Sequence, residues 1–418
     1  MSSRHVIVVG GGVVGAFTAY YLLKKGWSVT VVERDRLGRG ASGGNCGLIV
    51  PNHILPLNSF RTLAQGLLWM VRKDAPLYIK PSRANPGLLK WLLQFAWHAR
   101  PEAILKAIEG RHQLLQSSFD LYQEFMAAEK AACGWNVDDG SLHVYQSATL
   151  WAQYRKTNVF LNRFGIQAEP MDGKAVHKFA STLSPQVVGG WHYRHTAHLR
   201  PEYLMSELRR ILSQRGARIL ENCSVDRIRS ENGNAVAMLA AEKKLTADAY
   251  VLSTGAWTPY FEKALGCRVP IQPGKGYSIT LNRSTAFPKI PCFFEEQRVV
   301  STPWTNDCRL GGTMEFSGFD SQLDRRRLVA LNSAYRRYVD CRRMADIKEE
   351  WCGFRPMTVD GLPFIGRSPR LGNVYLAAGH NMIGISAAPA TGKLMAELLE
   401  GATPHIDPHP FRVDRLKS

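Results

Sequence analysis

The sequence predicts an α/β fold, α+β overall, in which a domain built on a parallel sheet is interleaved with a domain built on a mixed sheet. Three observations lead to this prediction. The first 33 residues contain a buried strand, a glycine-rich turn, a helix and a second buried strand. Short apolar runs that suit the same sheet return far along the chain, as AYVLSTGAW and NVYLAAG. Between them lie helical and strand-rich segments that have the character of insertions.

The opening unit is a strand, a helix and a second strand. The run HVIVV is continuously apolar, as a parallel strand covered on both faces should be. The next segment has apolar residues at helical spacing and ends at Gly26, a residue type suited to the C-cap. The run WSVTVVE predicts a second strand that ends at Glu33 and closes a βαβ unit.

The remaining elements follow in a less regular order. Residues 60–130 have mostly helical spacing, and strands with turns predominate from Gly140 onward. A helix is expected over residues 201–216, followed by short buried runs. Residues 268–349 predict further strands and then a basic helix, and the last helix is expected over residues 386–401.

Composition sets the broad class of protein. A hydrophobic content of 45% with 21% charged residues is typical of a globular chain. No run approaches the roughly 18 apolar residues of a membrane span, and the N-terminus lacks the pattern of a signal peptide. The eight cysteines are scattered without CxxC pairs, so no metal site is expected. We therefore expect a cytoplasmic protein.

The formal net charge of +18 has three interpretations: a basic solvated surface, peripheral attachment to an anionic membrane, or RNA binding. A nucleic-acid partner is disfavoured, because the basic residues are dispersed and no aromatic–basic run suits nucleotide stacking. The Trp-rich segment from Leu67 to Trp97 suits a membrane surface, although packing against the rest of the protein is the favoured interpretation. The sequence therefore does not decide whether the protein contacts the inner face of the plasma membrane.

A nucleotide-binding motif lies in the opening unit. Gly10, Gly12 and Gly15 form GxGxxG between the first strand and its helix. These glycines permit a tight turn, close approach to a pyrophosphate, and close helix packing. Glu33 ends the second strand, where a carboxylate can accept from both ribose hydroxyls and disfavours NADP. FAD and NAD remain as the candidate dinucleotides.

Three further motifs complete the pattern. They are RGASGGNCGL, whose small residues can line a flat ligand, then GFRPMTVDGLPFIG, and lastly AAGHNMIGISAAPATGKLMAELL. Together with the opening unit they resemble the D-amino acid oxidase superfamily of FAD-dependent oxidoreductases, and within it bacterial D-amino acid and D-hydroxyproline dehydrogenases. The resemblance implies FAD as cofactor. It also implies a Rossmann-like FAD-binding domain in residues 1–55, 197–270 and 350–418, interleaved with a mixed-sheet substrate-binding or cap domain in 56–196 and 271–349.

The resemblance assigns cofactor contacts to the opening unit, to RGASGGNCGL, to the last motif, and to residues in NCSVDRI and STGAW. The implied cofactor-binding residues are Gly10, Gly12, Val14, Gly15, Glu33, Arg34, Ser42, Asn45, Gly47, Leu48, Val225, Thr254, Gly255, Ala256, Gly379, His380, Met382, Ile383, Gly384 and Ile385. Amides at the start of the last helix would stabilise negative charge on the reduced flavin. His380 is expected to be a structural hydrogen-bonding residue, and Pro389 is expected in the first turn of that helix.

Three residues are catalytic candidates. Arg355, in GFRP, matches the arginine that clamps the substrate carboxylate in this superfamily, and the alternative is a salt bridge to Asp360 or Glu350. The Tyr277 hydroxyl is a candidate to assist the substrate, with core packing as the alternative. His53 is a candidate for the substrate face of the flavin, and a structural histidine is the alternative.

The implied function is oxidative deamination of a D-amino acid, including a cyclic one such as D-hydroxyproline. Electrons would pass to a respiratory or artificial acceptor, either a quinone or an electron-transfer protein. Three alternatives remain: the flavin subunit of a hetero-oligomeric amine dehydrogenase, a glycine/sarcosine-type oxidase, and a tRNA-modifying flavoenzyme. The motifs specify neither the amino acid nor its stereochemistry.

Overall fold

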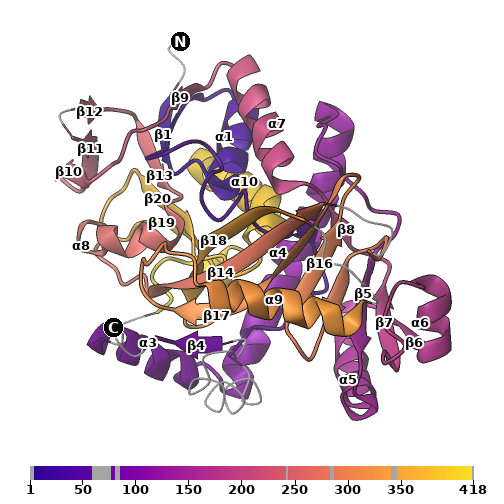
Figure 1. Cartoon of the computed structure of the whole chain (residues 1–418). Helices are drawn as coiled ribbons and strands as arrows, with labels where there is room; N and C mark the ends of the chain where they lie inside the picture. The colour runs from indigo at the N-terminus through magenta and orange to yellow at the C-terminus, as the bar shows by residue number, and fades with distance from the viewer. Residues whose placement is uncertain are drawn as a thin grey trace.

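The computed structural model describes residues 4–58, 77–80, 85–241, 243–282, 287–339 and 346–416. Two sheets organise the chain (Figure 1). The first is six-stranded, in the order β19-β20-β13-β1-β2-β9. Its strands are β1 (His5–Val9), β2 (Ser28–Val32), β9 (Arg218–Leu220), β13 (Ala249–Leu252), β19 (Phe364–Arg367) and β20 (Val374–Ala378). All neighbours pair in parallel except β19 with β20, which are antiparallel.

Helices α1 (Val13–Lys24) and α10 (Gly384–Glu400) pack against this parallel sheet. Helix α7 (Pro201–Gln214) packs against α1, and helix α4 (Pro101–Glu129) packs against α10. The first and last helices of the chain lie side by side, because a Cβ on Gly392 would come within 2.6 Å of the Phe17 carbonyl carbon. Glycine at this position allows the two backbones to approach. The C-terminal helix α10 thus packs directly against the helix of the N-terminal βαβ unit.

The second sheet is mixed and nine-stranded, in the order β18-β14-β17-β16-β15-β5-β7-β6, with β4 added beside β17. Its strands are β4 (Leu77–Ile79), β5 (Ser141–Tyr145), β6 (Glu169–Asp172), β7 (Gly189–Tyr193), β14 (Ile271–Asn282), β15 (Cys292–Phe294), β16 (Val299–Pro303), β17 (Asp307–Phe316) and β18 (Ile347–Thr358). Neighbours are antiparallel except in the β15–β5 and β17–β4 pairs.

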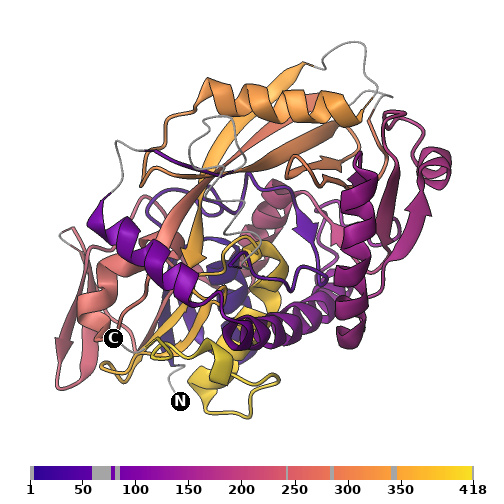
Figure 2. The same ribbon diagram turned by 90° about the horizontal axis from the view of Figure 1, so that it is seen from below.

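The two faces of this mixed sheet differ. Helix α9 (Arg325–Tyr338) covers one face, where Leu328 and Leu331 share a core with Ile279 of β14. The opposite face meets the loop that follows β2, since the Ser278 hydroxyl donates to the Gly44 carbonyl at 2.8 Å. Figure 2 shows this layering, with α9 on one outer side of the sheet and α10 on the other. Side chains alternate between these faces along each strand.

The smaller elements lie around the two sheets. They are β3 (Leu48–Ile49) paired with β8 (Ala197–His198), the three-stranded sheet β10 (Arg227–Glu231), β11 (Asn234–Ala240) and β12 (Lys243–Leu245), the helices α3 (Pro86–Trp97), α5 (Ala148–Leu161), α6 (Gly173–Phe179) and α8 (Glu262–Leu265), and the 3-10 turns η2 (Asn162–Phe164), η3 (Gly255–Phe261) and η4 (His409–Phe411). Within the described ranges, no helix has both the length and the apolar character that a membrane crossing requires.

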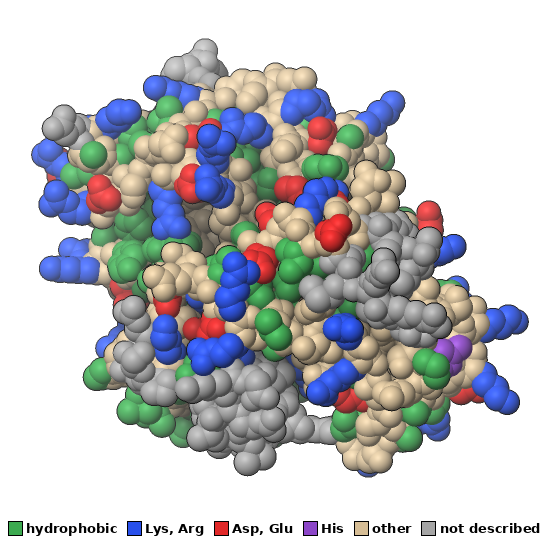
Figure 3. Space-filling model, viewed as in Figure 1, with side chains coloured by type: hydrophobic (Ala, Val, Ile, Leu, Met, Phe, Trp, Pro, Cys, Tyr) green, Lys and Arg blue, Asp and Glu red, His purple; other side chains and the backbone are tan. Residues whose placement is uncertain are grey.

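The predicted fold class is confirmed by a parallel and a mixed sheet built from interleaved segments. The helical character predicted for residues 60–130 is found in α3 and α4, and residues 60–76 lie outside the described ranges. The division into two domains stays a prediction. Strand β18 begins before the predicted boundary at residue 350 and pairs along its length with β14 of the mixed sheet. Figure 3 shows Lys and Arg scattered over one face of the molecule among acidic residues.

Candidate active site

One continuous cavity of about 2140 Å³ is lined by residues of both sheets. Pockets for a single small ligand have volumes of roughly 300–1,000 Å³, so this cavity has room for a much larger molecule. Val9 and Ala378 line it from the parallel sheet, and Gly276 and Arg355 line it from the mixed sheet. The cavity therefore lies where the two sheets face each other.

The glycine turn after β1 has the geometry that the motif predicts. Gly10 has a φ of +108°, and a Cβ there would lie 2.3 Å from the Ser253 carbonyl oxygen. A Cβ on Gly15 would lie 1.9 Å from the Gly10 carbonyl oxygen, which leaves room for no other residue. Gly12 and Val14 line the cavity, whereas Gly15 packs behind the turn. The N-terminus of α1 thus opens into the cavity, with the positive end of its dipole at the turn.

Glu33 is held in place at the end of β2. Its Oε2 accepts from the Gly11 amide at 2.7 Å, and its Oε1 accepts from the Asp35 amide at 3.0 Å. A carboxylate has about four acceptor positions, so acceptors remain for ligand hydroxyls. The neighbouring Arg34 guanidinium lies 3.4 Å from the centroid of the Trp257 ring. These side chains and Val225 line the same end of the cavity.

The loop of residues 39–48 is braced by its own side chains. Asn45 Nδ2 donates to the carbonyls of Ala41 and Ser42, and Asn45 Oδ1 accepts from the Gly47 amide at 2.8 Å. The Asn45 side chain therefore supports the loop from within, although the residue lines the cavity as predicted. The Ser42 hydroxyl accepts from the Val13 amide at 2.9 Å and joins the loop to α1. Gly47 and Leu48 also line the cavity.

The turn after β20 carries a residue that the sequence did not single out. Asn381 has a φ of +51°, and its Oδ1 accepts from the Thr358 amide at 2.9 Å. This bond ties the turn to the end of β18. Gly379 has a φ of +83° and packs against Thr358 rather than lining the cavity. The other predicted residues of these late motifs line the cavity: Thr254, Gly255, Ala256, His380, Met382, Ile383, Gly384 and Ile385.

His380 is a buried neutral histidine. Its Nε2 lies 3.0 Å from the Thr391 hydroxyl, and burial lowers the pKa of His380 to about 3. This contact fits the predicted structural role. Pro389 is a correction, because α10 begins at Gly384 and the proline lies inside the helix. A proline there leaves the Ile385 carbonyl without its helical donor, and the Tyr122 hydroxyl of α4 donates to that carbonyl at 2.7 Å.

Arg355 faces the cavity without an acidic partner among the described residues. Its guanidinium donates to the Thr313 carbonyl at 2.7 Å and, more weakly, to the Gly312 carbonyl at 3.5 Å. Burial lowers the pKa of Arg355 to about 10, so it stays charged at neutral pH. The nearby Cys46 thiol is neutral, because burial raises its pKa to about 11.

The predicted alternative of a salt bridge from Arg355 is wrong. Asp360 is paired with Arg415 at 2.7 Å, and Glu350 is paired with Arg325. Both acids are therefore already neutralised by other arginines. The guanidinium of Arg355 remains the positive group of the cavity wall formed by β18 and β14.

The catalytic role of Tyr277 stays a prediction: the residue is among those that line the cavity, but its hydroxyl is engaged elsewhere. Its hydroxyl donates to Glu315 Oε2 at 2.7 Å, and its ring is part of the core beneath α9. Along β14, Gly276 and Ser278 face the loop side of the sheet, so the intervening Tyr277 points to the opposite face. The structure does not bring this hydroxyl to Arg355. The core-packing alternative describes the tyrosine correctly.

His53 lines the cavity just beyond the loop. Its ring lies 5.1 Å from the Phe293 ring and 6.0 Å from the His143 ring, measured between centroids. Burial and the neighbouring His143 lower the pKa of His53 to about 3, so the imidazole is neutral. The part of the chain that the structure describes offers its ring nitrogens no hydrogen bond, while Arg111 fixes its backbone carbonyl at 2.7 Å.

A second polar cluster lines the cavity near His53 and was missed by the sequence. His143 Nδ1 lies 2.7 Å from Glu295 Oε1, and Arg298 lies 3.0 Å from Glu295 Oε2. Burial alone would raise the pKa of Glu295, but the bond from His143 and the charge of Arg298 lower it to about 2. These residues lie about 150 positions apart, and only the β5–β15 pairing brings them together. No local pattern in the sequence marks them.

The sequence profile of the DAO family, FAD dependent oxidoreductase, matches residues 5–398. The chain belongs to this family of FAD-dependent oxidoreductases. Its sequence is 28% identical to a D-amino acid dehydrogenase of Paramagnetospirillum magneticum, with 99% of each chain covered. It is 29% identical to a D-amino acid dehydrogenase of Methylobacterium nodulans, with 96% of each covered.

Solved structures share the fold of this family member. A glycine oxidase from Bacillus cereus ATCC 14579 matches with a TM-score of 0.79 at 19% identity, over 100% of both chains. The L-proline dehydrogenase from P. horikoshii matches with a TM-score of 0.75 at 19% identity, over 99% of this chain and 98% of the other. The predicted superfamily and the predicted cofactor, FAD, are confirmed.

The residues of the cavity fit FAD. Gly10 and Gly15 leave no space for side chains within the turn and behind it, and Gly12 lines the cavity, where a pyrophosphate can approach the backbone. The fixed Glu33 carboxylate has acceptors for ribose hydroxyls, and the loop of residues 39–48 extends from that end toward Arg355. The assignment of individual cofactor contacts stays a prediction.

Proposed function

We propose that this FAD-dependent oxidoreductase deaminates a D-amino acid, by transfer of a hydride from the α-carbon to flavin N5 and hydrolysis of the resulting imine. The observation that carries the proposal is Arg355, a charged side chain to which the described residues offer no acidic partner, in the cavity that the predicted FAD-binding residues line. The names of the curated relatives supply the substrate class. A cyclic substrate such as D-hydroxyproline would leave a cyclic imine.

Arg355 would bind the substrate carboxylate. A guanidinium fork makes two parallel charge-assisted hydrogen bonds to a carboxylate, which fixes the orientation of the α-carbon as well as adding affinity. The fork is itself oriented by the Thr313 carbonyl and lies against Gly276, where a Cβ would come within 2.2 Å of Nη1. Gly276 therefore leaves the space that the guanidinium occupies.

His53 would contact the amine side of the substrate. The amine must be neutral when the α-hydrogen leaves, and its lone pair then supplies the electrons for the C=N bond. With a pKa of about 3, the His53 imidazole is unprotonated at neutral pH and presents a lone pair rather than a charge. It can accept a hydrogen bond from the amine N–H without placing a positive charge beside the amine. We assign no catalytic role to Tyr277.

The electron acceptor would be a quinone or an electron-transfer protein, reached at a membrane surface. Support comes from α3, where Leu89, Leu93 and Trp97 are spaced by four residues and are each 60% or more exposed. Such a stripe suits shallow insertion among lipid headgroups. A vesicle flotation assay with anionic lipid tests the contact. Flotation that does not change in Leu93→Glu would contradict it.

An anaerobic substrate panel tests the proposed reaction. The purified yellow protein is mixed with D-amino acids, including cis-4-hydroxy-D-proline, and bleaching of the flavin absorbance is recorded. The L-enantiomers, glycine and sarcosine form the comparison arm, because a glycine oxidase shares the fold. Bleaching by D-amino acids supports the proposal. Bleaching by L-amino acids or glycine alone would refute the substrate class, and readmitting oxygen then separates oxidase from dehydrogenase.

A further inference from the structure

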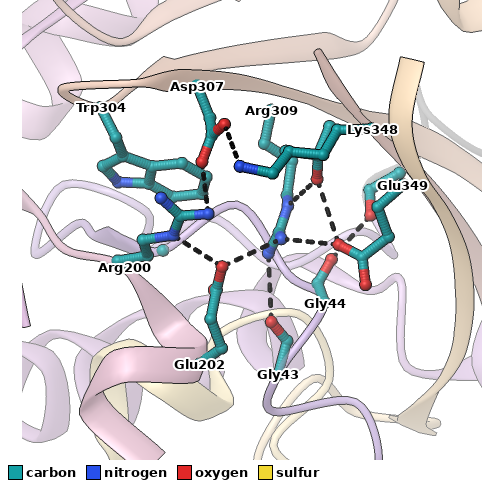
Figure 4. A network of polar contacts seen from close by, with 12 residues as sticks. Gly43, Gly44, Arg200, Glu202, Trp304, Asp307, Arg309, Lys348 and Glu349 are labelled. Carbon is teal, nitrogen blue, oxygen red and sulfur yellow. Dashed lines mark hydrogen bonds and ion pairs between the residues drawn. The ribbon is translucent and has the colours of Figure 1, made fainter. Parts of the chain in front are cut away.

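A second arginine, Arg309, lies on the same face of the mixed sheet as Arg355. It belongs to β17, pairs with Thr280 of β14, and is 1% exposed. Its Nε donates to the Thr280 hydroxyl at 2.9 Å, and its Nη1 donates to the carbonyls of Gly43 and Asn45 at 3.1 and 3.0 Å. Figure 4 shows the guanidinium reaching from the sheet to the loop. One side chain thus spans the two parts of the molecule.

The loop sits directly on the sheet beneath this arginine. A Cβ on Gly44 would lie 2.1 Å from the Trp351 ring, and a Cβ on Gly311 would lie 2.2 Å from Cys46 Sγ. Glycine is therefore required on both sides of the contact. The close approach lets buried donors of the sheet reach the loop backbone.

These donors orient three successive carbonyls. Arg309 binds those of Gly43 and Asn45, and the Ser278 hydroxyl binds that of Gly44 between them. In a trans peptide the N–H points away from the preceding C=O. The amides of Gly44, Asn45 and Cys46 therefore point away from the sheet. Among the described residues none of these amides has an acceptor, and all three residues line the cavity.

The charge of Arg309 is balanced within a network of six ionic side chains. Arg309 contacts Glu202 at 3.4 Å and Glu349 at 3.1 Å. Glu202 also pairs with Arg200 at 2.7 Å, and Arg200 and Lys348 both contact the buried Asp307 (Figure 4). Three cations thus face three anions. Removing one cation leaves the network with one net negative charge.

We propose that Arg309 is a positioning residue for FAD. It turns the loop carbonyls toward the sheet, so that the amides of residues 44–46 face the cofactor cavity as donors, and it places a positive charge behind them. Oriented amides and a nearby cation stabilise negative charge that a bound group acquires. Arg309 therefore supports both FAD affinity and reduction of the bound flavin. This role requires FAD but no particular substrate, so it does not depend on the proposed deamination.

Three variants of the full chain separate the effect of the hydrogen bonds that the Arg309 guanidinium makes from the effect of its positive charge. Arg309→Gln removes both, and Arg309→Lys keeps the charge but cannot reproduce the fork. Arg200→Gln is the matched control, since it makes the same charge change in the same network without a bond to the loop. For each protein we would measure the FAD dissociation constant of the apoprotein, the midpoint potential of bound FAD, and the melting temperature of the apoprotein.

The expected pattern is specific. FAD affinity falls about tenfold in both Arg309 variants, the size expected for a hydrogen bond to a charged group. The two-electron reduction equilibrium shifts about tenfold toward oxidised flavin in Arg309→Gln, about 30 mV, and stays near the parent value in Arg309→Lys. Arg200→Gln changes both by less than about threefold, even where its apoprotein melts earlier.

Two results would overturn the proposal. One is parental FAD affinity and potential in Arg309→Gln, and the other is an equal loss of both in Arg200→Gln. If Arg309→Gln does not fold, Ser278→Ala takes its place, because it removes only the donor to the Gly44 carbonyl. A loss of FAD affinity of about fivefold is then expected, and an unchanged affinity refutes the role of the oriented carbonyls.

Discussion

Arg309 and Arg355 face the same side of one sheet but have opposite surroundings. Arg309 has two carboxylates, two carbonyls and a hydroxyl as partners, so its charge is satisfied by the protein. Arg355 has only neutral acceptors in the described structure. A partly buried charge without a counter-ion is costly. The difference supports the proposal that Arg355 is available to an anionic substrate, because the described residues do not neutralise it.

The largest expected effect is on substrate use by Arg355→Met. Loss of one partner of a buried charge pair costs roughly 2–5 kcal/mol, so kcat/KM for the best amino acid should fall by a factor between about 30 and about 5,000. The FAD content should stay at the parent level, because Arg355 is not among the residues predicted to contact the cofactor. Steady-state kinetics with an artificial acceptor measure the first quantity, and the flavin-to-protein absorbance ratio measures the second. An unchanged kcat/KM would show that Arg355 does not bind the substrate, and the proposed difference in role between Arg355 and Arg309 would be wrong.

Stability should change in opposite directions at the two arginines. Arg309→Gln should destabilise the apoprotein by about 2 kcal/mol, less than a fully buried pair would give, since Glu202 and Glu349 are partly exposed. Arg355→Met should leave stability unchanged or raise it, because it removes an uncompensated charge. Urea unfolding of both apoproteins tests this. A larger loss of unfolding free energy in Arg355→Met than in Arg309→Gln would show that the protein itself satisfies the charge of Arg355 better than that of Arg309.

His380 is also buried in the protein, but unlike the two arginines it is neutral, because burial favours loss of its proton. Its folded pKa of about 3 lies below the unfolded value of about 6.5. The unfolded chain therefore binds the proton first, and stability falls as pH drops from about 6.5 toward 3. His380→Gln should flatten the decline of the apoprotein melting temperature between about pH 6 and pH 4. A parallel decline in both proteins would show that other groups dominate.

The smallest effect on catalysis is expected at Tyr277. Tyr277→Phe should change kcat/KM by less than about threefold, because the hydroxyl is bonded to Glu315 on the face opposite Arg355. It should cost about 1 kcal/mol of stability, since Glu315 loses one donor. A large fall in kcat/KM with normal stability would restore Tyr277 to the catalytic set.

The sequence could predict those features whose residues lie close together along the chain, and it could not predict those that only the fold brings together. Gly10, Gly12 and Glu33 lie in one βαβ unit, so their spacing was enough. The direction of the Tyr277 hydroxyl could not be predicted, because β14 is buried on both faces and its sequence has no alternation to tell which face holds the cavity. Arg309 and Glu295 were missed because their partners come from strands and loops far away in the sequence.

The hydrogen bond from Tyr122 to the Ile385 carbonyl joins the start of α10 to α4. Pro389 cannot close the helical bond to that carbonyl, so the first turn of α10 is held there by α4 instead. The start of α10, which lines the cavity, is therefore fixed in place by a side chain of another helix. The shape of this cavity wall thus depends on how α4 packs against α10 as well as on α10 itself.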